Sequence, residues 1–211
     1  SDVAPGGLVL EVGSNDGTLL EALTTHGMRA IGVEPSQQLA EISKEKCEAV
    51  YTNFLDRELS DFLVKEYGDF DFVVGNNVFA HIDDLVGAFK IAHTILKRGG
   101  YLVFEVAHAL KLVEHKLFDT IYHEHYSYLS LITVEKILNS HGLMVFDVEE
   151  LATHGGSLRV YASQLGTRIE EPRVAILRVK ELKAGMSNIK TYTDFSDRVV
   201  TIKSEILEFF L

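Results

Sequence analysis

The sequence predicts an α/β protein built on a doubly wound, mostly parallel sheet of seven strands. Two observations support this fold class. Over roughly the first half of the 211 residues, short apolar runs alternate with amphipathic stretches, which is the order of strand–helix units joined by right-handed crossovers. The apolar runs are also nearly continuous, which is typical of parallel strands that are buried on both faces.

The parallel part of the sheet is predicted from five such runs, with a helix after each of the first four. The strands are expected at 8–12, 30–34, 48–52, 71–75 and 101–106, and the helices at 17–27, 36–46, 57–68 and 83–100. Gly27 closes the first helix, and Ser36 is the expected N-cap of the second. Asp83 or Asp84 caps the fourth helix, which we expect to end at the Gly-Gly pair 99–100.

The pattern changes after the fifth strand. A helix is expected at 133–143, followed by strands at 144–151 and 157–164 that form an antiparallel hairpin on the sheet edge. From about residue 172 the chain becomes amphipathic and helical. We therefore predict one domain over 1–170, and a helical segment over 171–211 that begins a second α/β domain.

Composition limits the classes of partner. The net charge of −11 disfavours binding to nucleic acid or acidic membranes, because both need a positive field. The single cysteine, Cys47, excludes an internal disulfide and a cysteine-based zinc site within these residues. The sequence has no apolar stretch of membrane-spanning length and no signal segment at its start. We expect a cytoplasmic monomer that binds a small-molecule substrate and neither nucleic acid nor a membrane.

The turn after the first strand, "EVGSNDGTL", carries Glu11 and Asp16 beside Gly13 and Gly17. The dinucleotide fingerprint G-x-G-x-x-G brings backbone close to a pyrophosphate, which two acidic groups would repel. They suit a cationic ligand such as the sulfonium and ammonium of S-adenosylmethionine. Glu34 ends the second strand, where a carboxylate can accept hydrogen bonds from both ribose hydroxyls. The alternative is a helix-opening turn that binds nothing.

These segments resemble the class I S-adenosylmethionine-dependent methyltransferases. The matching stretches are "LEVGSNDG", "GVEPS" and "DFVVGNNVFAHIDDL", and the edge hairpin also matches that fold. The resemblance implies a cofactor site formed by the ends of four strands. Its expected members are Gly13, Ser14, Asn15 and Gly17 at the methionine part, Glu34 and Pro35 at the ribose, Asn53 near the adenine, and Asn76 and Asn77 at the fourth strand.

The segment "IYHEHYSYLS" (121–130) follows the fifth strand on the same rim. If it is extended, Tyr122 and Glu124 share one face while His123 and His125 share the other, whereas a bend would let all four converge. Packing of its tyrosines into the core is the structural alternative. A divalent metal is another, since these histidines and Glu124 could join His108 and His115. The ligand set is unfinished, however, and we expect no metal.

Together with "THGGSLRVY", this segment resembles the central domain of the nucleotide-sugar C-methyltransferases, which add a branch methyl group to deoxysugars. Members of that family carry a cysteine-rich zinc-binding domain before this region and a second α/β domain after it. The resemblance implies methylation of the carbon beside a keto group, with His125 as the base that removes its proton. It places Tyr122 and Glu124 at the sugar or the enolate, and His81 on the facing wall.

The hairpin loop is a further candidate for substrate contact. His154, Ser157 and Arg159 could meet the sugar or its phosphates, or the two glycines of "HGGSLR" could serve only as a turn. Two other functions remain open at this stage. One is O- or N-methylation of a sugar or other small metabolite by the same histidine, and the other is a cofactor-binding module without turnover.

Overall fold

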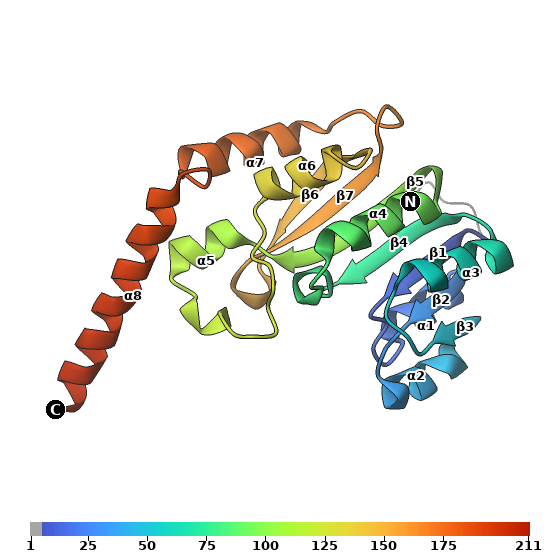
Figure 1. The fold of residues 1–211 in the computed structure, drawn as a ribbon, viewed down its shortest axis with the longest axis horizontal. Helices are drawn as coiled ribbons and strands as arrows, with labels where there is room; N and C mark the ends of the chain where they lie inside the picture. The colour runs from blue at the N-terminus through green and yellow to red at the C-terminus, as the bar shows by residue number, and fades with distance from the viewer. Residues whose placement is uncertain (1–5) are drawn as a thin grey trace.

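The computed structural model describes residues 6–211, and a single mixed sheet organises them (Figure 1). Its strands are β1 (Leu8–Val12), β2 (Arg29–Val33), β3 (Ala49–Tyr51), β4 (Phe70–Asn76), β5 (Leu96–Ala107), β6 (Leu143–Leu151) and β7 (Ser157–Gln164). The order across the sheet is β3-β2-β1-β4-β5-β7-β6. Strands β1 to β5 run parallel, and β7 is antiparallel to both β5 and β6. The predicted fold class and the edge hairpin are confirmed.

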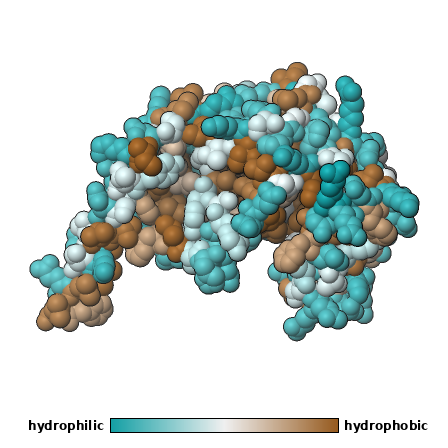
Figure 2. Space-filling view, in the orientation of Figure 1, coloured by the Kyte–Doolittle hydropathy of each residue, from teal (hydrophilic) through white to brown (hydrophobic). Residues whose placement is uncertain are grey.

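Helices connect and cover the strands. They are α1 (Thr18–Thr25), α2 (Gln37–Ser43), α3 (Arg57–Tyr67), α4 (Leu85–Ile95), α5 (Ala109–His115), α6 (Leu131–Asn139), α7 (Pro172–Lys183) and α8 (Ile189–Phe210). Helices α6 and α7 pack against each other and against β6. Helix α8 leads away from the sheet, and Figure 2 shows apolar side chains at its free end, where Phe209 and Phe210 are exposed. None of the helices described is both long and apolar enough to cross a bilayer.

An aromatic part of the core lies next to the turn that follows β4. Phe79, Phe89 and Phe104 are fully buried or nearly so, and their ring centroids lie 5.1–5.3 Å apart. Truncation of a buried phenylalanine typically costs about 3–5 kcal/mol. Phe79 belongs to the short 3₁₀ turn Phe79–His81 that follows β4. The aromatic cluster therefore fixes the turn that places His81 near the carboxyl end of β4.

The prediction that α4 ends at a glycine pair is wrong. Helix α4 stops at Ile95, and β5 begins at Leu96, which pairs with Phe70 before the register shifts. A Cβ at Gly100 would lie 2.9–3.0 Å from three backbone oxygens, so this irregular stretch of strand needs glycine. Helix α5 was not predicted, and α6 begins at Leu131 rather than 133, with Ser130 as its N-cap.

Candidate active site

A cavity of about 1040 Å³ opens at the carboxyl ends of β1, β2 and β4, where ligands of open parallel sheets bind. All but one of the predicted cofactor residues line it. These are Glu11, Gly13, Ser14, Asn15, Glu34, Pro35, Asn53, Asn76 and Asn77. The exception is Gly17, which serves as the N-cap of α1 and approaches Ser43 closely.

The turn after β1 is folded back onto β2. The N–H of Gly13 donates to the carbonyl of Val33 at 2.8 Å. Gly13 has φ +66°, and a Cβ there would lie 2.4 Å from a methyl carbon of Val78. Only glycine combines this backbone conformation with such a close approach. The turn thus keeps one wall of the cavity close to the segment after β4.

Glu34, which directly follows β2, also holds this turn. Its carboxylate is buried, with Oε2 accepting the N–H of Asn15 at 2.9 Å and Oε1 accepting the N–H of Ser36 at 2.8 Å. A carboxylate offers about four acceptor positions, so each oxygen can take one further donor. Because Glu34 also lines the cavity, it can bind a pair of hydroxyl groups while keeping its structural contacts.

Two buried polar groups of the cavity lack partners among residues 6–211. They are Oε2 of Glu11 and Oγ of Ser14. Burial, together with the negative charges of Asp16 and Glu34, raises the pKa of Glu11 to about 8. Unpaired buried polar atoms are costly, and a ligand with hydrogen-bond donors and positive charge would satisfy both. These two acceptor oxygens fit the cationic end of S-adenosylmethionine, and the negative charges around them disfavour a pyrophosphate.

Binding of S-adenosylmethionine near pH 7 should release a proton from Glu11. With its pKa at about 8, this carboxyl is mostly protonated in the free protein, and a bound cation favours its ionised form. Affinity should therefore rise with pH up to about 8. Calorimetry in buffers of different ionisation enthalpy measures this release. Glu11→Gln should abolish it, and an unchanged release in that variant would assign the proton to another group.

The Y-H-E-H segment forms a turn in which Tyr122 and His125 meet. The N–H of His125 donates to the carbonyl of Tyr122 at 3.1 Å. Nδ1 of His125 lies 2.8 Å from the carbonyl oxygen of Thr120, which can only accept, so Nδ1 carries the proton. The neutral ring then presents the lone pair of Nε2, to which the Tyr122 hydroxyl donates at 3.0 Å. This tautomer is the one that a general base at Nε2 requires.

The turn is docked on the rim of the cavity. The N–H groups of Tyr126 and Ser127 donate to the carbonyl of Ala80, at 2.9 and 3.2 Å. Nδ1 of His81 donates to the carbonyl of Glu124 at 2.9 Å, and the rings of His81 and His125 lie 4.7 Å apart. His81 also lines the cavity. The structure therefore brings His81, Tyr122 and His125 together beside the cofactor cavity.

Other members of the segment point elsewhere. The side chains of His123 and Glu124 are 90% and 66% exposed, so the turn does not bring all four residues together, and it is not an extended strand. Within residues 6–211, no group of three or more histidine, cysteine or acidic side chains is placed to hold a metal ion. His108, an alternative ligand, is buried against Glu181 instead.

The three hairpin candidates lie outside the lining of the cavity. Ser157 is buried and donates to the carbonyl of Thr153 at 3.2 Å. The guanidinium of Arg159 is held by Glu105 at 3.2 Å and by Glu149 at 3.5 Å. His154 is exposed, in a left-handed backbone conformation with φ 53°. Contact of these three residues with substrate stays a prediction.

Sequence reasoning missed two exposed aromatic residues of the site. Phe54 and Tyr126 both line the cavity, and both are largely exposed at its rim. The sequence could have indicated both, because each directly follows a residue predicted for the site: Phe54 follows Asn53, and Tyr126 follows His125. Large apolar groups exposed at the mouth of a cavity are typical of ligand contact surfaces.

Comparison with known proteins agrees with this geometry. A family model described as a methyltransferase domain matches residues 4–148, and one described as a C-methyltransferase C-terminal domain matches 152–211. C-methyltransferase NovU of Streptomyces niveus is 33% identical over 204 residues, covering 96% of this chain and 49% of that protein. The human mitochondrial ubiquinone biosynthesis O-methyltransferase is 29% identical over 154 residues, covering 65% of this chain and 41% of that protein. The chain thus spans about half the length of the curated relatives it matches, or less.

A solved structure shows the same fold. Magnesium protoporphyrin IX methyltransferase from Synechocystis, with bound S-adenosylmethionine, superposes with a TM-score of 0.56 at 16% identity, covering 76% of this chain and 71% of that one. The methyltransferase family model covers more than half of the present chain and includes β1 to β5 with their helices. The chain belongs to the methyltransferase domain family.

Proposed function

We propose that this chain is the core of an S-adenosylmethionine-dependent C-methyltransferase that acts beside the keto group of a nucleotide-activated deoxysugar. The observation that carries the proposal is the His125 imidazole, held in one tautomer by Thr120 and facing the Tyr122 hydroxyl beside the cavity. Similarity to a C-methyltransferase over 96% of the chain supports transfer to carbon.

The cavity residues divide between the two ends of the cofactor. Glu34 would accept the ribose hydroxyls, while Glu11 and Ser14 would receive the donors of the methionine end. When bound, S-adenosylmethionine supplies a methyl group on an electrophilic sulfonium. Phe54 would add apolar area at the rim of the cavity, where it is 77% exposed in this structure.

Carbon methylation needs a carbanion, and the turn at 122–125 supplies the groups that would form one. Nε2 of His125 takes the proton from the carbon beside the ketone, and the C–H electron pair becomes the enolate. The Tyr122 hydroxyl occupies the Nε2 lone pair in this structure, so it would first turn to the ketone oxygen and would then donate to the enolate oxygen. The enolate carbon would then be the nucleophile for the methyl group that the bound cofactor would supply.

An O-methyltransferase is the second candidate, because the human relative with 29% identity carries that name. In that case His125 would deprotonate a hydroxyl group instead of a carbon, with the same tautomer and the same neighbour. The two functions therefore differ in the substrate placed against Nε2 and in the bond that is formed.

Product analysis separates these functions. The full-length enzyme is incubated with ¹³C-methyl-labelled S-adenosylmethionine and a panel of nucleotide-activated keto-deoxysugars. We expect a labelled methyl group that stays on the ring through acid hydrolysis. We also expect the hydrogen beside the ketone to exchange with deuterated water without the methyl donor, because deprotonation precedes transfer. A labelled methoxy product without this exchange would replace the proposal with O-methylation.

A further inference from the structure

A buried hydrogen bond between a histidine and a carboxylate, outside the proposed chemistry, lies at the base of the segment that carries His125. Residues 109–130 leave the sheet after β5 and return before α6, and they include α5 and the Y-H-E-H turn. Their two ends are side by side, since the N–H of Ala109 donates to the carbonyl of Leu129 at 2.9 Å. His108 immediately precedes this excursion, and Leu131 begins the helix that follows it. The position of the turn therefore depends on how these two ends are held.

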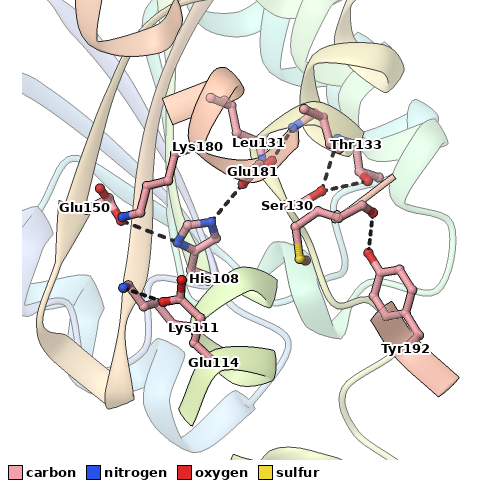
Figure 3. A network of polar contacts seen from close by, with 12 residues as sticks. His108, Lys111, Glu114, Ser130, Leu131, Thr133, Glu150, Lys180, Glu181 and Tyr192 are labelled. Atoms are coloured by element: carbon pink, nitrogen blue, oxygen red, sulfur yellow. Dashed lines mark hydrogen bonds and ion pairs between the residues drawn. The ribbon is translucent and has the colours of Figure 1, made fainter. Parts of the chain in front are cut away.

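Glu181 of α7 contacts both ends at once (Figure 3). Its Oε1 accepts Nε2–H of His108 at 2.8 Å and the N–H of Leu131 at 2.7 Å, while Oε2 accepts the N–H of Ile132 at 2.9 Å. The side chains of Glu181 and His108 are both 0% exposed. One carboxylate thus satisfies three donors, two of which are N–H groups of the first turn of α6 that the Ser130 cap does not reach.

We propose that Glu181 is a positioning residue: it fixes the base of the 109–130 excursion and so holds His125 at the cavity rim. Its catalytic consequence rests on the proposed function. The tip of the excursion is open to solvent, with Ile121, Tyr122 and Tyr126 all exposed, so its own burial stabilises it little. The three hydrogen bonds that dock the tip on Ala80 and His81 then form only if the base presents the turn to them.

The same contacts connect the turn to the C-terminal part of the chain. Glu181 lies within the stretch that matches the C-methyltransferase C-terminal domain, whereas His125 lies within the methyltransferase match. Lys180, its neighbour on α7, pairs with Glu150 of β6 at 2.6 Å. The placement of α7 on the sheet is thereby transmitted to the base of the excursion.

Glu181→Gln tests this role with little change of shape. The glutamine amide has one acceptor oxygen where the carboxylate has two. Its NH₂ group would therefore face at least one of the three N–H groups, and that N–H would lose its acceptor. Arg178→Gln is the matched control, because Arg178 of α7 pairs with Glu135 of α6 at 2.6 Å and contacts neither end of the excursion. Both substitutions remove a polar link between the same two helices, and only the first acts on the excursion.

In the full-length enzyme, Glu181→Gln should speed hydrogen–deuterium exchange of the amides of 118–127 about tenfold or more, and Arg178→Gln should not. Turnover and exchange of the substrate hydrogen should fall about 10- to 100-fold in Glu181→Gln, as expected for a displaced base, with cofactor affinity unchanged. Equal amide exchange in the two variants, or wild-type turnover in Glu181→Gln, would overturn the proposal.

A second pair of variants keeps the test valid if Glu181→Gln does not fold. His108→Gln can retain an N–H directed at Glu181, whereas His108→Leu cannot. We expect His108→Gln to stay close to wild type and His108→Leu to show the fast amide exchange; equal behaviour of the two would overturn the positioning role. Amide exchange is independent of the chemistry, so a methoxy product would refute the proposed function and leave this result standing.

Discussion

His125→Asn should lower turnover about 10²–10⁴-fold, the usual contribution of a positioned base, and leave cofactor affinity unchanged. The asparagine amide can occupy the place of the Nδ1–H group and still donate to the carbonyl of Thr120, so the turn should keep its shape. It has no lone pair in the place of Nε2. Turnover with a keto-sugar substrate and calorimetry with S-adenosylhomocysteine measure the two effects separately.

Exchange of the substrate hydrogen with deuterated water, followed without methyl donor, isolates the deprotonation. It should be lost in His125→Asn and reduced less in Tyr122→Phe, because the tyrosine would stabilise the enolate rather than accept the proton. Glu124→Gln should also reduce the exchange less than His125→Asn does. His123→Gln is the matched control within the turn, since that side chain is 90% exposed. Exchange at the wild-type rate with methylation lost would reduce His125 to a substrate contact and favour His81 as the base.

Glu34→Ala should weaken the binding of S-adenosylmethionine and S-adenosylhomocysteine by about 1–3 kcal/mol, the scale of hydrogen bonds to a charged group. The substitution removes the proposed acceptor of both ribose hydroxyls. It also frees the backbone N–H groups of Asn15 and Ser36, so the turn after β1 should loosen. Isothermal titration calorimetry gives the affinity directly.

Glu41→Ala provides the control for charge. Glu41 is an exposed carboxylate of α2 that pairs with Lys44, and its loss should leave cofactor affinity unchanged. NAD should not bind to the wild-type chain, because the negative charges of Asp16 and Glu34 beside the turn disfavour a pyrophosphate. Tight NAD binding without binding of S-adenosylhomocysteine would contradict the assigned ligand.

Most residues that the sequence predicts for the cofactor line one cavity, because they follow directly from local patterns. Gly13 and Glu34 stand at the ends of apolar strands, and parallel strands bring their carboxyl ends to one edge. The stop of α4 could not be predicted in the same way. Glycines at 99 and 100 are typical of a helix end, and only the pairing of Leu96 with Phe70 of β4 shows that they belong to a strand.

The conformation of residues 121–130 could not be predicted from the sequence either, because groups far away in the chain determine it. The carbonyl of Ala80 accepts the N–H groups of Tyr126 and Ser127, and no local pattern relates these positions. His108 and Glu181 are separated by 73 positions in the chain, so the anchoring of the excursion is visible only in the folded molecule. The sequence supplied the reactive residue types, and tertiary contacts decided which of them meet.

The position of β7 between β5 and β6 affects the order in which the sheet can be completed during synthesis. Strand β6 leaves the ribosome before β7, yet among residues 6–211 β7 is the only strand that pairs with it. The long edge of β5 therefore stays open until residue 164 has emerged, and an open edge invites association with other chains. A fragment that ends at 148, where the methyltransferase match stops, would lack β7 and leave β6 with no neighbour to pair with. The seven-stranded sheet thus extends beyond the stretch that the methyltransferase model matches.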